Sequence, residues 1–174
     1  VNGVVKNSIF EKLGIKSTYI ISEISQDGKY ITSSIIDRGV KIYTIKEENI
    51  YSVSKIKINL FFLNVSAKSN FTRLMGVQPV KYGSVFLYKN GFRIYPYGVS
   101  GEDIFGINRR KQQGQKRFLG TRDVLGRVEI QGDDDQFIES TSRDGGLIKN
   151  EYYFELQDFF VKTIRKLEKY VVEI

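Results

Sequence analysis

Cysteine, histidine and tryptophan do not occur in this 174-residue sequence, which has only two prolines and one methionine. The lack of cysteine excludes disulfides and thiolate metal sites. The lack of histidine excludes a Ser-His-Asp triad, a histidine-based zinc site and any imidazole acid–base step within the chain. The function of the sequence therefore has to be sought in its charge, its amide side chains and its glycines.

Long hydrophobic runs are also missing. The longest, Leu60–Leu63, is far shorter than the roughly 20 apolar residues that span a bilayer, and the N-terminus lacks the apolar core of a signal peptide. We therefore expect a cytoplasmic protein with no membrane partner. The chain begins at Val1 rather than Met, and we expect it to be a piece of something larger.

Positive charge is concentrated in one segment. The chain carries a net charge of +7. The interval 109–127 holds one acid, Asp123, against seven bases: Arg109, Arg110, Lys111, Lys116, Arg117, Arg122 and Arg127. Such a concentration is typical of proteins with a phosphate-bearing partner, and also of a solvated surface.

The N-terminal third is rich in β-branched and aromatic residues broken by turn signals such as Asp27-Gly28 and Arg38-Gly39. It predicts an antiparallel meander of three strands, at Thr18–Ile24, Tyr30–Ile36 and Val40–Ile45. We interpret residues 1–50 as a β-rich extension or subdomain, and residues 51–174 as an α+β domain.

The rest of the chain alternates strand and helix patterns. Lys55–Leu63 predicts a strand that enters the core, and Ser66–Met75 predicts a helix that buries Phe71 together with Leu74 and Met75. Asn90-Gly91 between two β-rich runs is a strong hairpin signal. A further strand is expected at Val124–Ile130, interrupted by Gly126.

The C-terminal segment from Glu151 onward gives the clearest helical pattern. Its apolar residues recur at spacings of three and four: Tyr153, Leu156, Phe160, Ile164, Leu167, Val171 and Ile174. Lys162, Lys166 and Lys169 lie away from this row. The aromatic content favours a helix packed on a sheet, and the rival interpretation is a dimerising helix whose apolar row is exposed in the monomer.

Three adjacent carboxylates, Asp133–Asp135, raise the question of a calcium or magnesium site. They lack the spacing of an EF-hand loop, and consecutive acids on a turn usually point in different directions. We interpret them as a solvated acidic turn and predict no metal site in this chain.

The stretch Arg109–Gly114 combines the side chains that a phosphate site needs. Arginine offers a planar fork of donors and lysine a mobile point charge, while Gln112 and Gln113 could orient an oxygen without changing protonation. Gly114 would permit a close approach of the backbone. The segment is not a P-loop, since Gly-x-x-x-x-Gly-Lys-Ser/Thr does not occur.

Three longer stretches carry a resemblance to a known family. They are Gly83-Ser-Val-Phe-Leu-Tyr-Lys-Asn-Gly-Phe-Arg-Ile-Tyr-Pro-Tyr-Gly98, Gly106-Ile-Asn-Arg-Arg-Lys-Gln-Gln-Gly114 and Leu119-Gly-Thr-Arg-Asp-Val-Leu-Gly-Arg-Val-Glu-Ile130. Over roughly Lys55 to Ile174 the chain resembles the second, transducer or middle domain of GHKL ATPases. It looks closest to prokaryotic ATPases that are similar to heat-shock-protein-90 chaperones and histidine kinases.

The resemblance implies a fold and a division of labour. The fold would be that of the second domain of ribosomal protein S-five, a mixed sheet backed by helices, with a long C-terminal helix. ATP and Mg would be held by a preceding nucleotide-binding domain absent from this chain. The motifs of that domain have no counterpart here, so the isolated chain would not bind ATP tightly or hydrolyse it, whereas the parent protein would be an ATPase.

The resemblance also implies site residues. A basic side chain of the second domain would contact the γ-phosphate of ATP and favour the transition state. The matching region gives Lys111 or Arg110 as the catalytic contact with Gln113 beside it, and Arg109, Gln112 and Gly114 as further nucleotide-binding residues. Implied partners are the nucleotide-binding domain of the same protein, a homodimer of the parent, and a nucleic-acid or protein client of a chaperone-like activity.

The alternative function is a nucleic-acid-binding module that uses the basic segment 109–127. A positive net charge and 23 phenylalanines and tyrosines permit it. It predicts that the seven bases align along one groove with exposed aromatic residues such as Tyr95, Tyr97 or Phe118.

Overall fold

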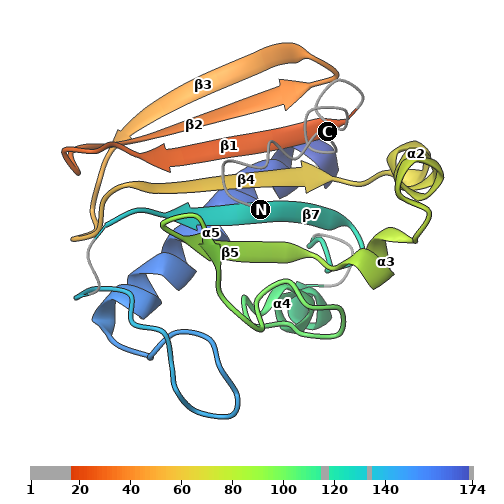
Figure 1. The fold of residues 1–174 in the computed structure, drawn as a ribbon. Helices are drawn as coiled ribbons and strands as arrows, with labels where there is room; N and C mark the ends of the chain where they lie inside the picture. The colour runs from red at the N-terminus through yellow and green to blue at the C-terminus, as the bar shows by residue number, and fades with distance from the viewer. Residues whose placement is uncertain (1–16, 115–117, 133–134, 173–174) are drawn as a thin grey trace.

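The computed structural model describes residues 17–114, 118–132 and 135–172, and its centre is one mixed sheet with a long helix against one face (Figure 1). In the described residues the sheet has seven strands, in the order β3-β2-β1-β4-β7-β5-β6. The first three form the predicted antiparallel meander: β1 (Thr18–Ile24), β2 (Tyr30–Asp37) and β3 (Val40–Glu48). The α+β class predicted from the sequence is confirmed.

The meander contains one irregularity. On β2, Ile35 pairs with Tyr43 whereas its neighbour Ile36 pairs with Lys41, so the register shifts and Ile42 becomes the extra residue of a β-bulge. Most of β3 is exposed on both faces of the sheet.

The remaining strands are joined to the meander through β4 (Ile56–Phe62), which pairs antiparallel with β1 on one side and with β7 (Val124–Ile130) on the other. Next to β7 lies the parallel strand β5 (Val85–Lys89), and β6 (Phe92–Arg93) forms a hairpin with β5. The sheet is continuous across residue 50, so residues on both sides of that position share one network of backbone hydrogen bonds.

Four helices occur in the described residues: α2 (Val65–Met75), α3 (Pro79–Tyr82), α4 (Ile107–Gly114) and α5 (Glu151–Val172). In Figure 1, α5 crosses behind the sheet, α2 and α3 lie beyond one end of the strands, and α4 lies below β5. None of the described helices is both long and apolar enough to cross a bilayer.

The main core lies between α5 and the sheet. Leu156, Phe160, Ile164 and Leu167 are all buried, in one cluster with side chains of β1, β4 and β7. Burying each such side chain contributes about 1.5–3 kcal/mol. The predicted apolar row of the C-terminal helix is therefore confirmed as a core face, and the interpretation that this row is exposed for dimerisation is wrong for the residues described.

A smaller core covers part of the opposite face of the sheet. Ala67 and Phe71 of α2 pack there against Phe61, Phe86 and Leu125. Asn64 caps the helix by accepting a hydrogen bond of 2.8 Å from the backbone N–H of Ala67. Leu74 and Met75, expected on the buried side, are exposed, because α2 contributes only its first two turns to this core.

Two backbone positions explain the geometry around β5 and β7. Asn90 and Gly91 have φ values of 51° and 85°, as the predicted two-residue hairpin turn requires. Gly126 does not interrupt β7. A side chain there would place its Cβ 2.2 Å from the carbonyl oxygen of Asn59 on β4, so glycine permits the close strand contact.

Candidate functional site

The basic segment forms a short, firmly anchored helix. Helix α4 connects the β5–β6 hairpin to β7, and its single fully buried side chain is Ile107. Asp103 caps its first turn, because one carboxylate oxygen accepts hydrogen bonds from the backbone N–H groups of Asn108 and Arg109, at 3.0 and 3.1 Å. The site residues proposed from the sequence thus lie on a rigid helix.

Arg110 is paired with a buried carboxylate. Its guanidinium forms two hydrogen bonds, of 2.7 and 2.6 Å, with the carboxylate of Glu168 on α5. Glu168 is 3% exposed and also accepts a hydrogen bond of 2.6 Å from the backbone N–H of Leu119. The Arg110 guanidinium lies 4.4 Å from the centre of the Phe118 ring. Through these hydrogen bonds the Glu168 side chain connects α5 both to α4 and to the segment that follows α4.

Lys111 belongs to a second, more open ion pair. Its ammonium lies 3.0 Å from Asp123, and the ammonium of Lys68 on α2 lies 3.3 Å from the other oxygen of the same carboxylate. Asp123 also accepts a hydrogen bond from the backbone N–H of Gly120. Burial alone would raise the pKa of Asp123, but this hydrogen bond and the two ammonium groups outweigh it and hold the pKa below its usual value.

A surface cavity of about 700 Å³ opens beside Lys111. Its polar lining comes from Asn108, Lys111, Gln112 and Asp123, and its apolar lining from Phe62, Phe118, Leu119 and Val172. Its volume is within the usual range of small-ligand sites. The structure therefore brings Lys111 and Gln112 together at one cavity, and the Lys111 side chain is 44% exposed there.

The other predicted site residues lie outside the lining of this cavity. Arg109 and Gln113 are exposed on α4. Gly114 is required for a reason that its sequence context does not reveal: a Cβ at this position would lie 2.3 Å from the ring of Phe118. Its backbone makes a close approach to an aromatic side chain of the same protein.

The five bases of the segment that the structure describes do not line one groove. Arg110 is paired with the buried Glu168, Arg122 lines a separate cavity beside α2 and α3, and Arg127 lies on β7 at 3.7 Å from Glu129. Lys116 and Arg117 lie outside the described residues. Among the aromatic partners proposed for nucleic-acid binding, Tyr97 is 1% exposed and belongs to the main core, so that expectation is wrong for Tyr97.

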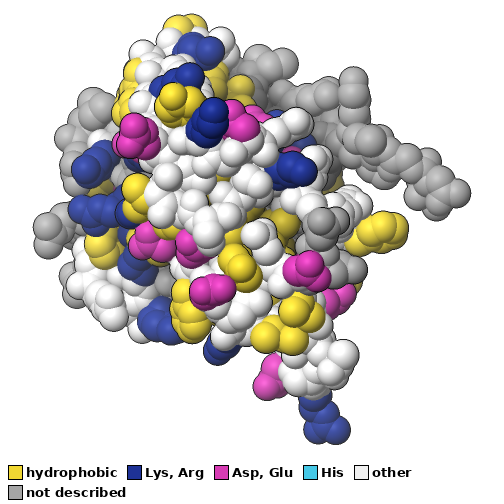
Figure 2. Space-filling view, turned by 90° about the vertical axis from the view of Figure 1, so that its left-hand side faces the viewer, with side chains coloured by type: hydrophobic (Ala, Val, Ile, Leu, Met, Phe, Trp, Pro, Cys, Tyr) yellow, Lys and Arg dark blue, Asp and Glu magenta, His cyan; other side chains and the backbone are white. Residues whose placement is uncertain are grey.

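Charges are interspersed elsewhere on the surface. On the face seen in Figure 2, basic, acidic and apolar side chains of the described residues are mixed. Of Asp133–Asp135 only Asp135 lies within the described residues. In the part of the chain that the structure describes, no group of three or more acidic side chains could hold a metal ion.

Sequence reasoning missed two features. One is a row of bases on α5, which the sequence pattern showed only as the polar side of a helix. The other is the loop between β7 and α5, which hangs below the sheet in Figure 1 and is closed by pairing of Glu139 with Leu147. Arg143 is exposed on this loop, and the hydrogen bond from Gly146 N–H to the carbonyl of Tyr95, 2.7 Å, fixes the loop to the segment after β6.

Neither a family model nor a curated protein matches this sequence.

Proposed function

We propose that this chain is the transducer-type second domain of a larger GHKL ATPase, with the second-domain fold of ribosomal protein S-five. In this proposal ATP and Mg are bound by a preceding domain, and a basic group of this chain reaches the γ-phosphate. The chain itself contributes a positively charged side chain and the helix that positions it. The contact between this side chain and the γ-phosphate couples nucleotide state to the angle between two domains.

The observation that carries the proposal is the placement of Lys111. Its ammonium lies at the edge of an open cavity, on a helix that Asp103 caps at one end and Glu168 fastens to α5. A group that stabilises a developing charge works best when it is positioned before the reaction, because no reorganisation is then needed. The mixed sheet with its parallel β5–β7 pair and long C-terminal helix fits the proposed fold.

Within this proposal Lys111 is the phosphate contact and Gln112 is its neighbour at the cavity. The Lys111 ammonium lies 3.0 Å from the carboxylate of Asp123. When ATP is bound, Lys111 would leave this carboxylate and pair with the γ-phosphate instead. Arg110 becomes a positioning residue, because its charge is already matched by a carboxylate that is 3% exposed.

Arg143 is a second base with the exposure that a contact between domains requires. It lies on a projecting loop whose turn is built by a backbone hydrogen bond from Gly145 to Ser142, 3.1 Å. Neither an ion pair nor a hydrogen bond of its side chain occurs among the interactions of the described residues. The loop could therefore carry its charge into a neighbouring domain without breaking an existing contact.

The test is ATP turnover by the parent protein and its variants. We expect the isolated chain to be inactive, and Lys111→Ala or Arg143→Ala in the parent to lower kcat at least tenfold, which is about 1.4 kcal/mol of transition-state stabilisation. Lys81→Ala, which removes an exposed base of α3, is the matched control and should leave kcat unchanged. Turnover by the isolated chain, or a parent indifferent to both substitutions, would refute the proposal.

Refutation would move the nucleic-acid-binding function to first place. That function predicts an affinity for nucleic acid whose logarithm falls linearly with the logarithm of the salt concentration. It ranks second because the described bases of segment 109–127 are dispersed over several elements and the charge of Arg110 is already matched by Glu168.

A further inference from the structure

A row of four bases lies on one face of α5, away from the segment 109–127. Lys162, Arg165, Lys166 and Lys169 follow one another at spacings of three, one and three residues. Residues three and four apart are neighbours on a helix surface, so these four side chains share one face over two turns, or about 10 Å. We call these residues the α5 basic row.

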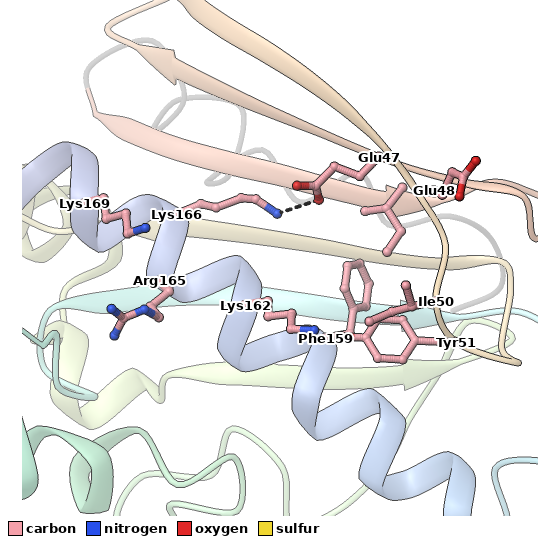
Figure 3. A pocket seen from close by; sticks show the side chains of 10 residues that line it. Glu47, Glu48, Ile50, Tyr51, Phe159, Lys162, Arg165, Lys166 and Lys169 are labelled. Carbon is pink, nitrogen blue, oxygen red and sulfur yellow. Dashed lines mark hydrogen bonds and ion pairs between the residues drawn. The ribbon is translucent and has the colours of Figure 1, made fainter.

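The α5 basic row borders a cavity of about 490 Å³ between α5 and the connection from β3 to β4 (Figure 3). The apolar part of its lining consists of Ile31, Ile50, Tyr51 and Phe159. A cavity of this size, with an apolar lining and a few charged groups, has the composition of a small-ligand site.

The aromatic wall of the cavity is fixed in place. The Tyr51 hydroxyl donates a hydrogen bond to Asp158, and the Lys162 ammonium lies 5.5 Å from the centre of the Tyr51 ring. Next to it, Glu155 of α5 accepts hydrogen bonds from the backbone N–H and the hydroxyl of Ser52, at 2.8 and 2.7 Å. A wall held in this way loses little conformational entropy when a ligand binds.

Two of the four bases already have acidic partners. Lys166 reaches across the cavity to Glu47 on β3, at 3.1 Å, and Lys162 pairs with Asp158, at 3.1 Å. In the part of the chain that the structure describes, no ion pair joins Arg165 or Lys169 to an acid. Glu48 also lines the cavity, so the four bases together with Glu47, Glu48 and Asp158 carry a net charge of +1.

We propose that this cavity binds a small phosphate monoester with an apolar or aromatic body. A phosphate monoester carries a charge of about −1.5 to −2 at pH 7 and has three strong acceptor oxygens, which suits the two bases of the row that have no acidic partner among the described residues. Arg165 and Lys169 take the phosphate, and Ile50, Tyr51 and Phe159 take the body. The lining of this cavity shares no residue with that of the cavity at Lys111, although the Arg165 guanidinium also lies 5.8 Å from the centre of the ring of Phe118, which lines the latter. The proposal does not depend on the ATPase assignment.

The acids make a long polyanion a poorer fit than a compact one. A nucleic-acid backbone needs an uninterrupted basic path, whereas Glu47 faces the row from the other side of the cavity and Asp158 stands at its beginning. The negative charges of Glu47 and Asp158 would repel the successive phosphates of a nucleic-acid backbone, whereas a single phosphate can bind between the bases without approaching both acids.

The experiment is a calorimetric titration of the 174-residue chain with phenyl phosphate and, separately, with inorganic phosphate. We expect phenyl phosphate to bind saturably and more tightly than inorganic phosphate. Replacing both unpaired bases, Arg165→Ala with Lys169→Ala, should weaken both ligands at least tenfold. Ile50→Ala, at a side chain that is 72% exposed, should weaken phenyl phosphate but not inorganic phosphate.

The matched control removes two exposed bases elsewhere, Lys81→Ala with Lys149→Ala, and should leave both affinities unchanged. Equal losses in the control and in the α5 variant would mean that general charge attraction, not this cavity, binds the ligand, and would overturn the proposal. Absence of saturable binding by phenyl phosphate would overturn it too. A single-stranded oligonucleotide that binds more tightly than phenyl phosphate, and loses affinity in the α5 variant, would assign the row to nucleic acid instead.

Discussion

Helices α4 and α5 both carry several bases, but they use them differently. On α4, Arg110 is matched by the buried carboxylate of Glu168, and Lys111 by the half-buried Asp123. On α5, the partners of Lys162 and Lys166 are solvent-exposed acids, and Arg165 and Lys169 have no ion pair in the described part of the chain. The bases are closer together in the sequence on α4 than on α5, but fewer bases of α4 are therefore available to a ligand.

The comparison teaches that a cluster of bases in sequence says little until the acids opposite it are known. Glu168 lies 58 residues from Arg110, so no local pattern connects the two. It is also on the helix face that otherwise carries the apolar core, where a carboxylate is tolerated only with its charge paired and its oxygens hydrogen-bonded.

The largest expected effect comes from removing the partner of Arg110. Glu168→Leu leaves the Arg110 guanidinium, on a side chain that is 15% exposed, without its carboxylate and the Leu119 N–H without its acceptor, so we expect a loss of about 3–5 kcal/mol in the free energy of unfolding. Urea denaturation measures this. The double variant Arg110→Leu with Glu168→Leu should be more stable than Glu168→Leu alone, because the unpaired charge is gone. If the double variant instead loses as much free energy of unfolding as Arg110→Leu and Glu168→Leu added together, the ion pair between the two residues is not the cause of the loss.

An intermediate effect is expected at Asp123, and it should depend on pH. The pKa of this carboxyl is lowered in the folded protein, so its stabilising contribution is present above the unfolded value of about 3.9 and is lost as the pH falls through the folded value. Asp123→Asn should cost about 1–2 kcal/mol at pH 7. Urea denaturation at pH 7 and at about pH 3 should show the difference between the two proteins shrinking in acid. A constant difference would contradict the ion-pair explanation.

The smallest effects are expected on the α5 basic row. Arg165→Met or Lys169→Met should change the free energy of unfolding by no more than about 0.5 kcal/mol, as is usual for exposed bases. Lys166→Met should cost more, up to about 1 kcal/mol, because this side chain is 23% exposed and ties α5 to β3. Thermal unfolding of the three variants makes the comparison. Equal and large losses in all three would mean that the row is part of the folded framework rather than available for binding.

The sequence was sufficient for the elements whose pattern is local. The strand Thr18–Ile24, the Asn90-Gly91 turn and the apolar row of α5 were each predicted from neighbours in sequence, and each prediction is confirmed. The exposure of Leu74 and Met75 could not be predicted in this way, because it depends on where the small second core ends rather than on the helix itself.

The candidate site was harder to predict because it depends on long-range partners. The segment 109–114 stood out in the sequence for its bases and amides, yet which of these bases is available follows from its contacts with Glu168, Asp123 and Phe118. Gly114 shows the same limit: its sequence context favours a phosphate contact, whereas the structure shows an aromatic ring against it. The assignment of a phosphate contact to Lys111 stays a prediction.

The bulge in β3 bears on how copies of the protein behave when they meet. β3 is the outermost strand on its side of the sheet, and an outer strand offers backbone groups to which another chain could add. The extra residue Ile42 breaks the regular spacing of those groups, and the strand carries charged side chains, among them Lys41 and Lys46, which favour contact with solvent over another chain. An outer strand with no fully buried side chain is thereby built to discourage aggregation.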